Sequence, residues 1–489
     1  MKLSDLLKDT DIKIEKDFDI NGIAVSSKEV NKDFVFFAIK GEKTDGNLYI
    51  DEAIKNGAKV IISENDIKDK NIIFLKTNDI LKTLSKASKN FYLNPSSKMK
   101  IIGITGTKGK TTVTTLIYKI LNKLSINTGL IGTIEYKTNN KTISTAENTT
   151  PLAHKLHQLL SIMLENGDKV CVLEVSSHAL KLKRVDDLEL DTAGFTNLTS
   201  DHMDFHKTKE DYINSKLKLF ELLELSPKKE KMVVLNLDDE FSKVVIPKIK
   251  KSKIVTYSLK NNSDLMAYDI DLKPDKTIFN IKFYDKKVKI KTNLIGLHNV
   301  YNILTAIASI SDMIKDLDQI SYIIENIETV SGRLEKIQSK KGFYIFIDYA
   351  HTEDSLRQAL STLKAIPHKR ILTVFGCGGD RDKTKRPLMG MVAEELSDYV
   401  IITSDNPRTE DPLKIISDIE KGFRDKTKYF IEVDREKAIK KVIEMAKEGD
   451  IILIAGKGHE DYQIIGNKKI HFSDKEVVIK YLKESKNES

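Results

Sequence analysis

A glycine- and lysine-rich turn within residues 101–112, IIGITGTKGKTT, has the composition of a phosphate-binding loop. Gly106 and Gly109 allow backbone N–H groups to turn toward a polyphosphate. Lys110 can reach the outer phosphates, and Thr111 offers a hydroxyl to Mg²⁺. Apolar residues follow at helical spacing, so a helix N-terminus would point at the same anion. The turn therefore predicts a site for a phosphate-bearing ligand.

Acidic, histidine and lysine residues follow further along the chain. Glu174 ends an apolar run that predicts a strand, where its carboxylate would face the phosphate loop and bind Mg²⁺. Residues 199–206 hold two His and two Asp, including His202. This combination suggests metal or proton chemistry, but surface loops often carry the same residues. Lys216 lies on an expected helix at 210–222, and taken alone it indicates a solvated lysine.

Near the C-terminus, three polar loops follow expected strands. They are GCGGDR at 376–381, DNPR at 405–408 and GKGHE at 456–460. Pro407 fixes the backbone that presents Arg408. Ligands gather at the carboxyl ends of strands in parallel sheets, so these loops predict a second ligand site.

The elements that must position these residues form three α/β domains. Residues 1–97 alternate short β-rich runs with helical stretches and end in a turn-rich link at 94–98, which predicts a small N-terminal α/β domain. Residues 98–330 begin with the phosphate loop and predict a central domain with a mostly parallel sheet. Residues 331–489 predict a C-terminal Rossmann-like α/β domain.

The expected strands come from short apolar runs separated by helical patterns. They are 22–25, 33–39, 59–62 and 71–75 in the first domain, 169–175, 193–198, 232–237 and 253–258 in the second, and 344–348, 370–375, 399–403 and 450–455 in the third. Residues 265–293 predict a β-meander, and residues 299–313 predict a helix.

The composition excludes several classes of protein. The chain has 489 residues and a net charge of +8, from 80 Lys and Arg against 72 Asp and Glu. No block of basic residues alternates with aromatics, which argues against a nucleic-acid partner. Cys171 and Cys377 are the only cysteines and indicate a reducing compartment rather than a disulfide framework. No signal peptide or membrane span is evident, so we expect a soluble cytoplasmic protein, and a monomer.

Taken together, the motifs resemble those of the Mur ligases, in the same order and across essentially the whole chain. The residues that carry the resemblance are 106–112 (GTKGKTT), 174–178 (EVSSH), 197–206, 296–299 (GLHN), 332–333 (GR), 348–351 (DYAH), 376–381 (GCGGDR) and 405–408 (DNPR).

The resemblance implies an ATP-dependent amide ligase of peptidoglycan precursor synthesis. ATP would phosphorylate the D-Glu γ-carboxylate of UDP-MurNAc-L-Ala-D-Glu, and the amine of an incoming diamino acid would attack the acyl phosphate. Activation is needed because a carboxylate is a poor electrophile. Catalysis would therefore consist mainly of positioning and of charge neutralisation by Mg²⁺ and Lys110.

The resemblance also implies roles for individual residues. Lys110, His202 and Lys216 would be catalytic. ATP would contact Gly106, Thr107, Lys108, Gly109, Lys110, Thr111, Thr112, Asn299, Asn302 and Arg333. Thr111 and Glu174 would hold one Mg²⁺, and His202 a second, together with Lys216 as an N6-carboxylysine (a carbamate). The uridine nucleotide would contact Ser27, Lys43, Thr44 and Asp45, and the muramyl dipeptide Thr149, Thr150, Ser176 and Arg184.

The incoming amino acid would occupy the C-terminal loops. Its contacts would be Arg381, Asp405, Asn406, Pro407, Arg408, Gly456 and Glu460. In the family, D-N-P-R accompanies meso-diaminopimelate, whose distal carboxylate pairs with the guanidinium of this motif, and lysine-adding members lack that arginine. Arg408 therefore predicts a diaminopimelate-adding member, although lanthionine has the same distal carboxylate and fits the same contact.

The chain departs from the family pattern at several positions. Lys108 replaces the usual Asn of the phosphate loop, which leaves the glycine geometry intact. Leu182 stands where the family has Gln, so contact with the dipeptide is expected to differ at this position. Ser26 and Lys28 replace Asp and Arg of the N-terminal D-S-R motif, so uridine recognition is expected to differ in detail.

Three other readings remain open at this point. A lysine-adding Mur ligase would lack Arg408. A folylpolyglutamate synthetase shares the ligase core but has no dedicated uridine-binding first domain, which counts against it here. A non-catalytic ATP-binding regulator would have lost Lys110, His202 or Lys216, and all three are present.

Overall fold

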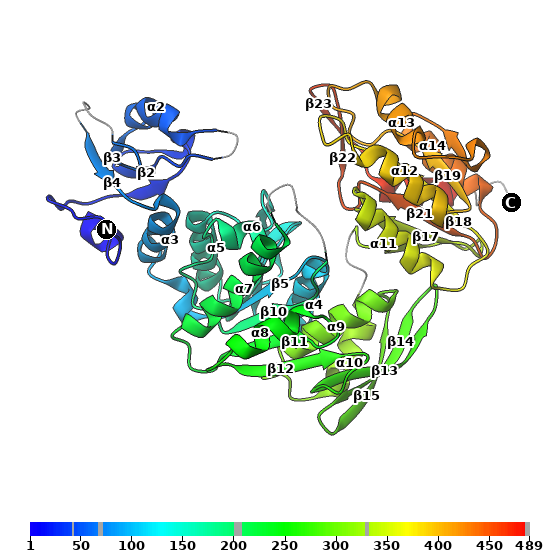
Figure 1. Cartoon of the computed structure of the whole chain (residues 1–489), viewed down its shortest axis with the longest axis horizontal. Coiled ribbons are helices and arrows are strands. Elements are labelled where there is room, and N and C mark those ends of the chain that lie inside the picture. Colours follow the sequence, from blue (N-terminus) through cyan, green and yellow to red (C-terminus); the bar gives the residue numbers. More distant parts are fainter. Residues whose placement is uncertain (42–43, 67–71, 200–207, 328–331, 485–489) are drawn as a thin grey trace. The chain divides into compact units, whose positions relative to one another are not determined.

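The structure is a computed structural model that describes residues 1–41, 44–66, 72–199, 208–327 and 332–484. The chain forms two compact units (Figure 1). The first unit comprises Met1–Met266 and Asn302–Ile314, and the second comprises Ala267–Tyr301 and Lys315–Ser489. Each unit has its own buried apolar core.

A four-stranded parallel sheet in the order β1-β2-β3-β4 opens the first unit. Successive side chains of a strand point to opposite faces, so Val35 and Phe37 pack with Leu84 of α3, whereas Phe36 packs with Ala53 of α2. Apolar side chains therefore bury both faces of this sheet. Its elements are α1 (Leu3–Leu6), β1 (Gly22–Ala24), η1 (Ser27–Glu29), β2 (Phe34–Phe37), η2 (Gly46–Tyr49), α2 (Ile50–Lys55), β3 (Ala58–Ser63), β4 (Ile73–Lys76), α3 (Ile80–Phe91) and η3 (Pro95–Lys98).

The larger sheet of the first unit has the order β12-β11-β10-β5-β9-β6-β7-β8. The pairs from β12 to β6 are parallel, and β7 and β8 add an antiparallel edge. β5 lies between β10 and β9, so the phosphate loop leaves the middle of the sheet. The strands are β5 (Lys100–Thr105), β6 (Thr128–Ile131), β7 (Glu135–Thr138), β8 (Lys141–Thr145), β9 (Val170–Glu174), β10 (Thr192–Phe195), β11 (Met232–Asn236) and β12 (Lys253–Ser258).

Helices connect and cover these parallel strands. All residues of β9 and β11 are buried, as expected for strands that are covered on both faces. The helices are α4 (Lys110–Lys123), α5 (Ala153–Glu165), α6 (Ser177–Lys181), α7 (Lys209–Leu225), α8 (Phe241–Val245) and η4 (Ile246–Lys248).

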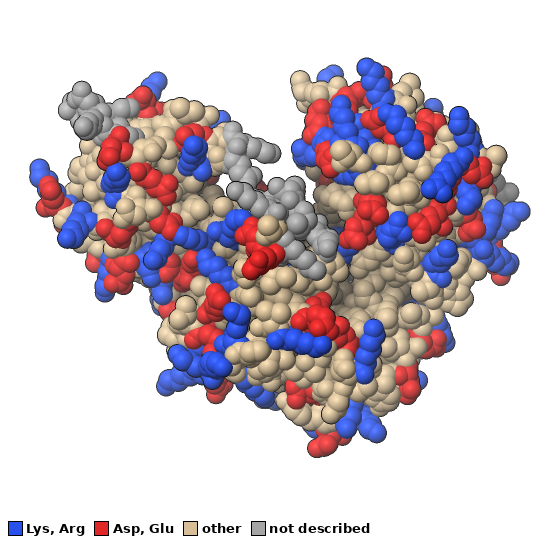
Figure 2. All heavy atoms as spheres, viewed as in Figure 1, with Lys and Arg blue, Asp and Glu red and all other residues tan. Residues whose placement is uncertain are grey.

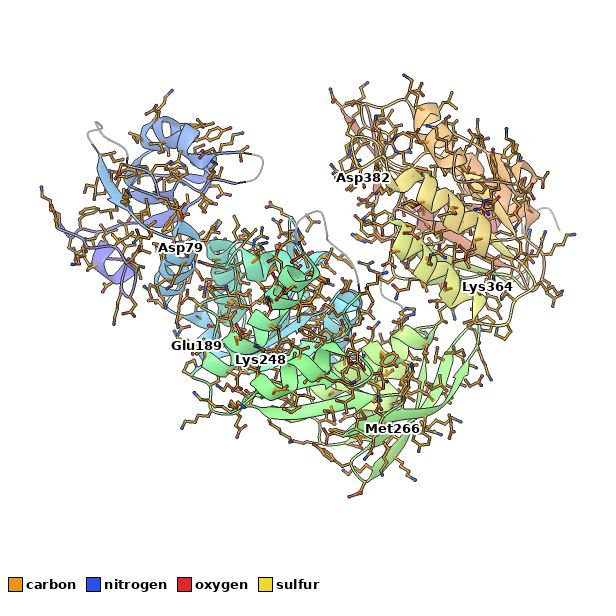
Figure 3. The ribbon with its side chains drawn as sticks, in the orientation of Figure 1. Asp79, Glu189, Lys248, Met266, Lys364 and Asp382 are labelled. Atoms are coloured by element: carbon orange, nitrogen blue, oxygen red, sulfur yellow. The ribbon has the colours of Figure 1, made fainter. Side chains whose placement is uncertain are left out.

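Ion pairs join α3 to the segment 183–189 of the same unit, and we call this contact the α3 seam. Asp79, the N-cap of α3, and Glu189 lie near opposite ends of the helix (Figure 3). Asn94 also donates to Glu189 at 2.6 Å. The pairs are Lys183 with Asp79, Lys86 with Asp187 (2.5 Å) and Lys89 with Glu189 (3.1 Å).

The second unit begins within β13 (Leu265–Leu272), whose first residues pair in parallel with β12. β14 (Thr277–Phe283) and β15 (Lys286–Thr292) form an antiparallel pair, and α10 (Leu317–Glu325) packs on β15. The chain passes back to the first unit within α9 (Leu297–Ser309).

A six-stranded sheet in the order β16-β17-β21-β18-β19-β20 forms the rest of the second unit. Only β16 is antiparallel to its neighbour. Helices α11, α12 and α13 pack on one face, and α14 and α15 on the other. The strands are β16 (Glu335–Gln338), β17 (Tyr344–Asp348), β18 (Ile371–Phe375), β19 (Tyr399–Ile402), β20 (Tyr429–Ile431) and β21 (Ile451–Ala455), with a separate hairpin of β22 (Tyr462–Ile465) and β23 (Lys468–His471). The helices are α11 (Glu353–Lys364), α12 (Lys385–Leu396), α13 (Pro412–Glu420), η5 (Lys426–Lys428), α14 (Arg435–Met445) and α15 (Asp474–Glu484).

The predicted α/β fold with mostly parallel sheets is confirmed, whereas the domain boundaries after residues 97 and 330 stay predictions. The helix expected at 299–313 is α9, which begins two residues earlier and ends at Ser309. The link at 94–98 contains the 3₁₀ helix η3 rather than a simple turn. The hairpins β7–β8 and β22–β23 were not predicted, because their alternating polar residues carry little apolar signal.

Charged residues of both signs intermingle over the face shown in Figure 2. Acidic side chains lie between the lysines and arginines, in keeping with the absence of a basic block in the sequence. Among the helices of the described ranges, none has the length and apolarity needed to cross a membrane.

Candidate active site

The phosphate loop joins the end of β5 to the first residue of α4. Gly106 and Gly109 have φ angles of +148° and +86°, which side chains rarely tolerate. A Cβ on Gly106 would also collide with the hydroxyl of Thr196, and one on Gly109 with the side-chain oxygen of Asn302. Glycine is therefore required at both positions, and it leaves the N-terminus of α4 open toward a ligand.

Side chains that follow β10 hold the outer part of the loop. Asn197 accepts a hydrogen bond from Lys108 N through its side chain (3.1 Å) and from Thr107 N through its carbonyl (2.8 Å). Thr196 donates to Lys108 O at 2.6 Å. The hydroxyl of Thr107 lies 2.9 Å from that of Tyr212 on α7. These contacts hold the outer part of the loop in place.

Two ammonium groups meet at one carbonyl of the loop. Lys110 Nζ donates to Gly106 O and Thr107 O, both at 2.9 Å, and Lys216 Nζ donates to Gly106 O at 2.9 Å. Lys216 is 1% exposed and lies 4.5 Å from the Tyr212 ring centroid. The interpretation of Lys216 as a solvated lysine is therefore wrong: α7 carries it under the loop.

Glu174, at the end of β9, accepts hydrogen bonds from side chains around the loop. Its Oε2 accepts from the hydroxyls of Thr111 and Thr133, each at 3.0 Å, and its Oε1 accepts from Thr133 N at 2.9 Å. The hydroxyl of Thr149 lies 3.1 Å from that of Thr133. Sequence reasoning missed Thr133, whose signal is a Gly-Thr pair directly after β6. The cluster consists of oxygen ligands, the type that Mg²⁺ prefers.

Thr150, Ser176 and Arg184 lie together beside the end of β9. Thr150 donates to Glu174 O at 2.7 Å, and Ser176 N donates to Thr150 Oγ1 at 3.2 Å. Arg184 Nη1 donates to Thr150 O at 2.6 Å, and its buried Nε has no partner among the described residues. Burial lowers the pKa of Arg184. A spare N–H on a half-buried guanidinium suits an anionic ligand. Leu182, the C-cap of α6, adds no polar group here.

The candidate uridine residues follow the neighbouring strands β1 and β2. Ser27 donates to Glu52 Oε2 at 2.8 Å, and Asp45 accepts from Asn47 N at 2.9 Å as the N-cap of η2. Thr44 is exposed, and its carbonyl accepts from Gly41 N at 2.9 Å. Lys43 lies outside the described residues, as does His202.

Asn299 and Asn302 lie one turn apart on α9. Asn302 faces Gly109 of the phosphate loop, whereas the Asn299 side chain donates to Ile295 O at 2.8 Å. Thr112, in the first turn of α4, is buried. In the second unit, the Arg333 guanidinium lies 5.7 Å from the Tyr349 ring centroid. Burial raises the pKa of Tyr349 to about 12.

Three loops at the carboxyl ends of β18, β19 and β21 lie together, and we call residues 376–382, 405–410 and 456–460 the rim loops. Gly379 N donates to Asn406 O at 2.9 Å, and Arg408 Nη1 donates to Gly379 O at 2.7 Å. Arg408 has a φ of +52°, and two backbone hydrogen bonds hold it there. Arg408 N donates to Ile464 O (3.0 Å), and Gly466 N donates to Arg408 O (2.7 Å). Arg381 is exposed on the first loop.

A buried arginine behind these loops binds two of them. Arg386 of α12 is fully buried and donates to both oxygens of Glu410, at 2.8 and 3.0 Å, and to Asp418 at 3.0 Å. Glu410 also accepts from Asp380 N at 2.6 Å. Hydrogen bonds from Arg386 are the largest cause that lowers the pKa of Glu410, to about 2. The sequence signals for Arg386 are a run of charges and the scarcity of arginine in this lysine-rich chain, which favours a bidentate contact with a carboxylate or phosphate.

The third rim loop brings Gly456 and Glu460 to the second. Asn406 donates to Glu460 Oε2 at 3.0 Å. A Cβ on Gly456 would lie 2.5 Å from the carboxylate of Asp405, so the two loops are in close contact. Pro407 is buried, and its carbonyl accepts from Glu410 N at 3.1 Å. The structure thus brings together the residues expected at the amino-acid site, and Arg381 lies on the same loops.

Family models match most of the chain. A Mur ligase middle domain matches residues 104–310, a Mur ligase glutamate ligase domain matches residues 332–458, and a Mur ligase family catalytic domain matches residues 19–96.

Individual proteins are similar over the full length. A UDP-N-acetylmuramoyl-L-alanyl-D-glutamate–2,6-diaminopimelate ligase of Caldanaerobacter subterraneus subsp. tengcongensis is 42% identical, covering 99% of this chain and 100% of the relative. A solved structure of a ligase with the same name has a TM-score of 0.73 and 30% identity, covering 99% of both chains. Folylpolyglutamate synthase of Mycobacterium tuberculosis is 17% identical with a TM-score of 0.63, covering 76% of this chain and 92% of its own, which shows a shared fold alone.

Proposed function

The chain belongs to the Mur ligase family, and from this membership we infer that it joins 2,6-diaminopimelate to UDP-N-acetylmuramoyl-L-alanyl-D-glutamate with ATP. The observation that carries the inference is the 42% identity along the whole length to a ligase of that name. The phosphate loop and the rim loops would supply the two kinds of site that this reaction needs.

The reaction proceeds in two steps. The D-Glu γ-carboxylate attacks the γ-phosphorus of ATP, which gives an acyl phosphate and releases ADP. The amine of diaminopimelate then attacks the acyl carbon, and the tetrahedral intermediate loses phosphate and a proton to give the amide. Because both reactants of the first step are anions, positioning and charge neutralisation dominate catalysis.

The phosphate loop fits ATP. Its two glycines leave space where any Cβ would collide, and the N-terminus of α4 provides N–H donors. Lys110 would move from the loop carbonyls to the phosphates that it neutralises. The other residues proposed for ATP are Thr107, Lys108, Thr111, Thr112, Asn299, Asn302 and Arg333.

The oxygen cluster of Thr111 and Glu174 fits Mg²⁺, because a hydroxyl and a buried carboxylate oxygen lie 3.0 Å apart there. The ion would offset charge on the phosphates during transfer. For a second Mg²⁺ we propose His202 and Lys216. Carbamylation would turn the buried Lys216 ammonium into an anionic oxygen ligand, and its position under the loop suits that role.

The remaining residues would bind the two organic substrates. We propose Ser27, Lys43, Thr44 and Asp45 for the uridine nucleotide, and Thr149, Thr150, Ser176 and Arg184 for the muramyl dipeptide. The partnerless Nε of Arg184 supports an anionic contact there. Arg381, Asp405, Asn406, Pro407, Arg408, Gly456 and Glu460 would bind the amino acid, with the Arg408 guanidinium on the distal carboxylate.

Phosphate release tests the proposal. Purified protein receives ATP, Mg²⁺ and UDP-N-acetylmuramoyl-L-alanyl-D-glutamate, together with meso-diaminopimelate, lanthionine or L-lysine. We expect release with meso-diaminopimelate, weaker or equal release with lanthionine and little with L-lysine. Activity with L-lysine alone would overturn the proposed role of Arg408, and no activity with any of the three would favour the regulator.

The substrates also suggest where and how the enzyme works. We propose that it acts in the cytoplasm, where ATP and uridine-nucleotide precursors are available, and as a monomer without nucleic acid. Light scattering at the enzyme's working concentration tests the monomer, and a dimer mass would contradict it.

A further inference from the structure

A lysine that the sequence analysis left unassigned is buried inside the third rim loop. Lys457 follows the end of β21 between two glycines of positive φ, Gly456 at +115° and Gly458 at +55°. A Cβ on Gly458 would lie within 2.9 Å of Tyr349. The backbone thus turns sharply here, and Glu460 N closes the turn on Lys457 O at 2.9 Å. As a result, the Lys457 side chain is 0% exposed.

The ammonium group of Lys457 contacts two residues proposed for the amino acid. Its Nζ lies 3.2 Å from Glu460 Oε2 and 3.2 Å from Asn406 Oδ1. Asn406 in turn donates to the same Glu460 oxygen at 3.0 Å. The Tyr462 ring centroid lies 5.5 Å from the nitrogen. The three side chains therefore form a closed hydrogen-bonded triangle that spans two loops.

The charges around this triangle differ in how they are balanced. Arg435, fully buried behind the loop, is paired with Asp474 at 2.7 Å and donates to Ala455 O at 3.0 Å. Its charge is therefore compensated within the core. Lys457 instead compensates Glu460, the carboxylate that would attract an ammonium group of the amino acid.

This compensation bears on which amino acids bind. A ligand end with only an ammonium group would meet Glu460 already shared with Lys457, and it would leave Arg408 of the same rim loops without a carboxylate. A ligand end with both an ammonium and a carboxylate group would satisfy Glu460 and Arg408 together. Burial strengthens both the attraction and the repulsion, because the local dielectric is low.

We propose that Lys457 is a specificity-determining residue, a second cation that makes the site select a zwitterionic distal end over a lone ammonium. It acts through Glu460 and Asn406, without forming part of the phosphate chemistry. The inference rests on the amino-acid site proposed above.

Lys457→Met tests the proposal, because it keeps the length of the side chain and removes the charge. We expect the KM for meso-diaminopimelate to rise about tenfold, the loss typical of a buried charge-assisted hydrogen bond. The KM for ATP should change less than about twofold, since no ATP contact involves this residue. The ratio of kcat/KM for L-lysine to that for meso-diaminopimelate should rise about tenfold. Lys457→Arg should keep the wild-type ratio.

Lys469→Met provides a matched control. Lys469 lies 3.9 Å from the centroid of the same Tyr462 ring but is exposed on β23, so its loss should leave the ratio unchanged. An unchanged ratio in Lys457→Met would overturn the proposal. An equal loss of kcat/KM toward meso-diaminopimelate, L-lysine and ATP would also overturn it.

A double variant guards against misfolding. Lys457→Met leaves the Glu460 carboxylate without its cation, and the variant could fail to fold for that reason. Lys457→Met with Glu460→Gln then removes both charges together. Because Lys457 acts through Glu460, this variant should have the same ratio as Glu460→Gln alone, and a different ratio would also overturn the proposal. Wild-type protein that releases no phosphate with any of the amino acids would contradict the proposed function instead, and calorimetric binding of the two amino acids would still measure the ratio.

Discussion

The phosphate loop and the rim loops are held in their conformations by different kinds of interaction. The phosphate loop is shaped by backbone: two glycines with positive φ, a strand that ends and a helix that begins within ten residues. The rim loops are shaped by charged side chains, Arg386 with Glu410 and Lys457 with Glu460, which come from separate parts of the chain. A polyphosphate can be bound by backbone N–H groups once glycines give the loop its shape, whereas the choice of an amino acid requires particular side chains.

This difference predicts which property of the protein a substitution in each region should change. A change of charge in the rim loops should alter stability and amino-acid binding and leave ATP binding intact. A change in the phosphate loop should do the reverse.

Arg386→Met should have the largest effect, because it leaves Glu410 and Asp418 without their buried cation. Breaking a buried ion pair in this way costs about 3–5 kcal/mol of unfolding free energy. Urea denaturation measures the loss. Arg357→Met is the control, since Arg357 forms exposed pairs with Glu353 and Glu395 that contribute about 0–1 kcal/mol. Equal losses in the two variants would show that charge at position 386 does not organise the loops.

Lys110→Met should come next, with a fall of about 10²–10³-fold in kcat. The substitution removes the cation that we propose neutralises the transferred phosphate, while the glycines that shape the backbone of the loop stay in place. Steady-state phosphate release measures it. Lys123→Met, at the exposed end of the same helix, should behave as wild type. A fall in stability equal to that of Arg386→Met would contradict the contrast between the two regions.

Arg408→Asn should raise the KM for meso-diaminopimelate by about 10–100-fold, as expected for a lost hydrogen bond to a charged group. Asn is chosen because it tolerates the φ of +52° at this position better than Ala. The KM for ATP should stay within about twofold. Parallel increases in both constants would argue against a contact between Arg408 and the amino acid.

Lowering the pH should reduce the stability of the protein through Glu410 of the rim loops. Of the four predictions in this comparison, this one has the smallest expected effect. Its pKa lies at about 2 in the folded protein, below its ordinary value of 4.5. The stabilisation is therefore present above pH 4.5 and is lost as the pH falls toward 2. Thermal unfolding between pH 5 and 3 should lose more stability in the wild type than in Glu410→Gln. Identical pH profiles would mean that Glu410 titrates alike when folded and unfolded.

Much of the fold and of the phosphate site could be predicted from the sequence. The strands β3, β9, β11, β12 and β17 were placed to within a residue or so, because parallel strands read as continuous apolar runs. The phosphate loop was visible because its function depends on consecutive residues. The roles assigned to individual residues of both sites stay predictions.

Long-range side-chain contacts could not be predicted. Lys216 was taken alone as a solvated lysine, since its contact with Gly106 crosses 110 positions. Lys457 was passed over for the same reason, and the sequence could not identify the partners of Arg386: charged residues are buried only where distant partners compensate them. Thr133 carried only a Gly-Thr pair as a signal.

The α3 seam has a consequence for work in concentrated salt. Its three cations are lysines, strongly hydrated groups that give up a carboxylate more readily than a guanidinium does. Added electrolyte would screen all three pairs at once. The sheet that begins the chain would then loosen from its neighbour, so a substrate that binds residues of both, as proposed above, would bind more weakly before the phosphate loop itself was disturbed.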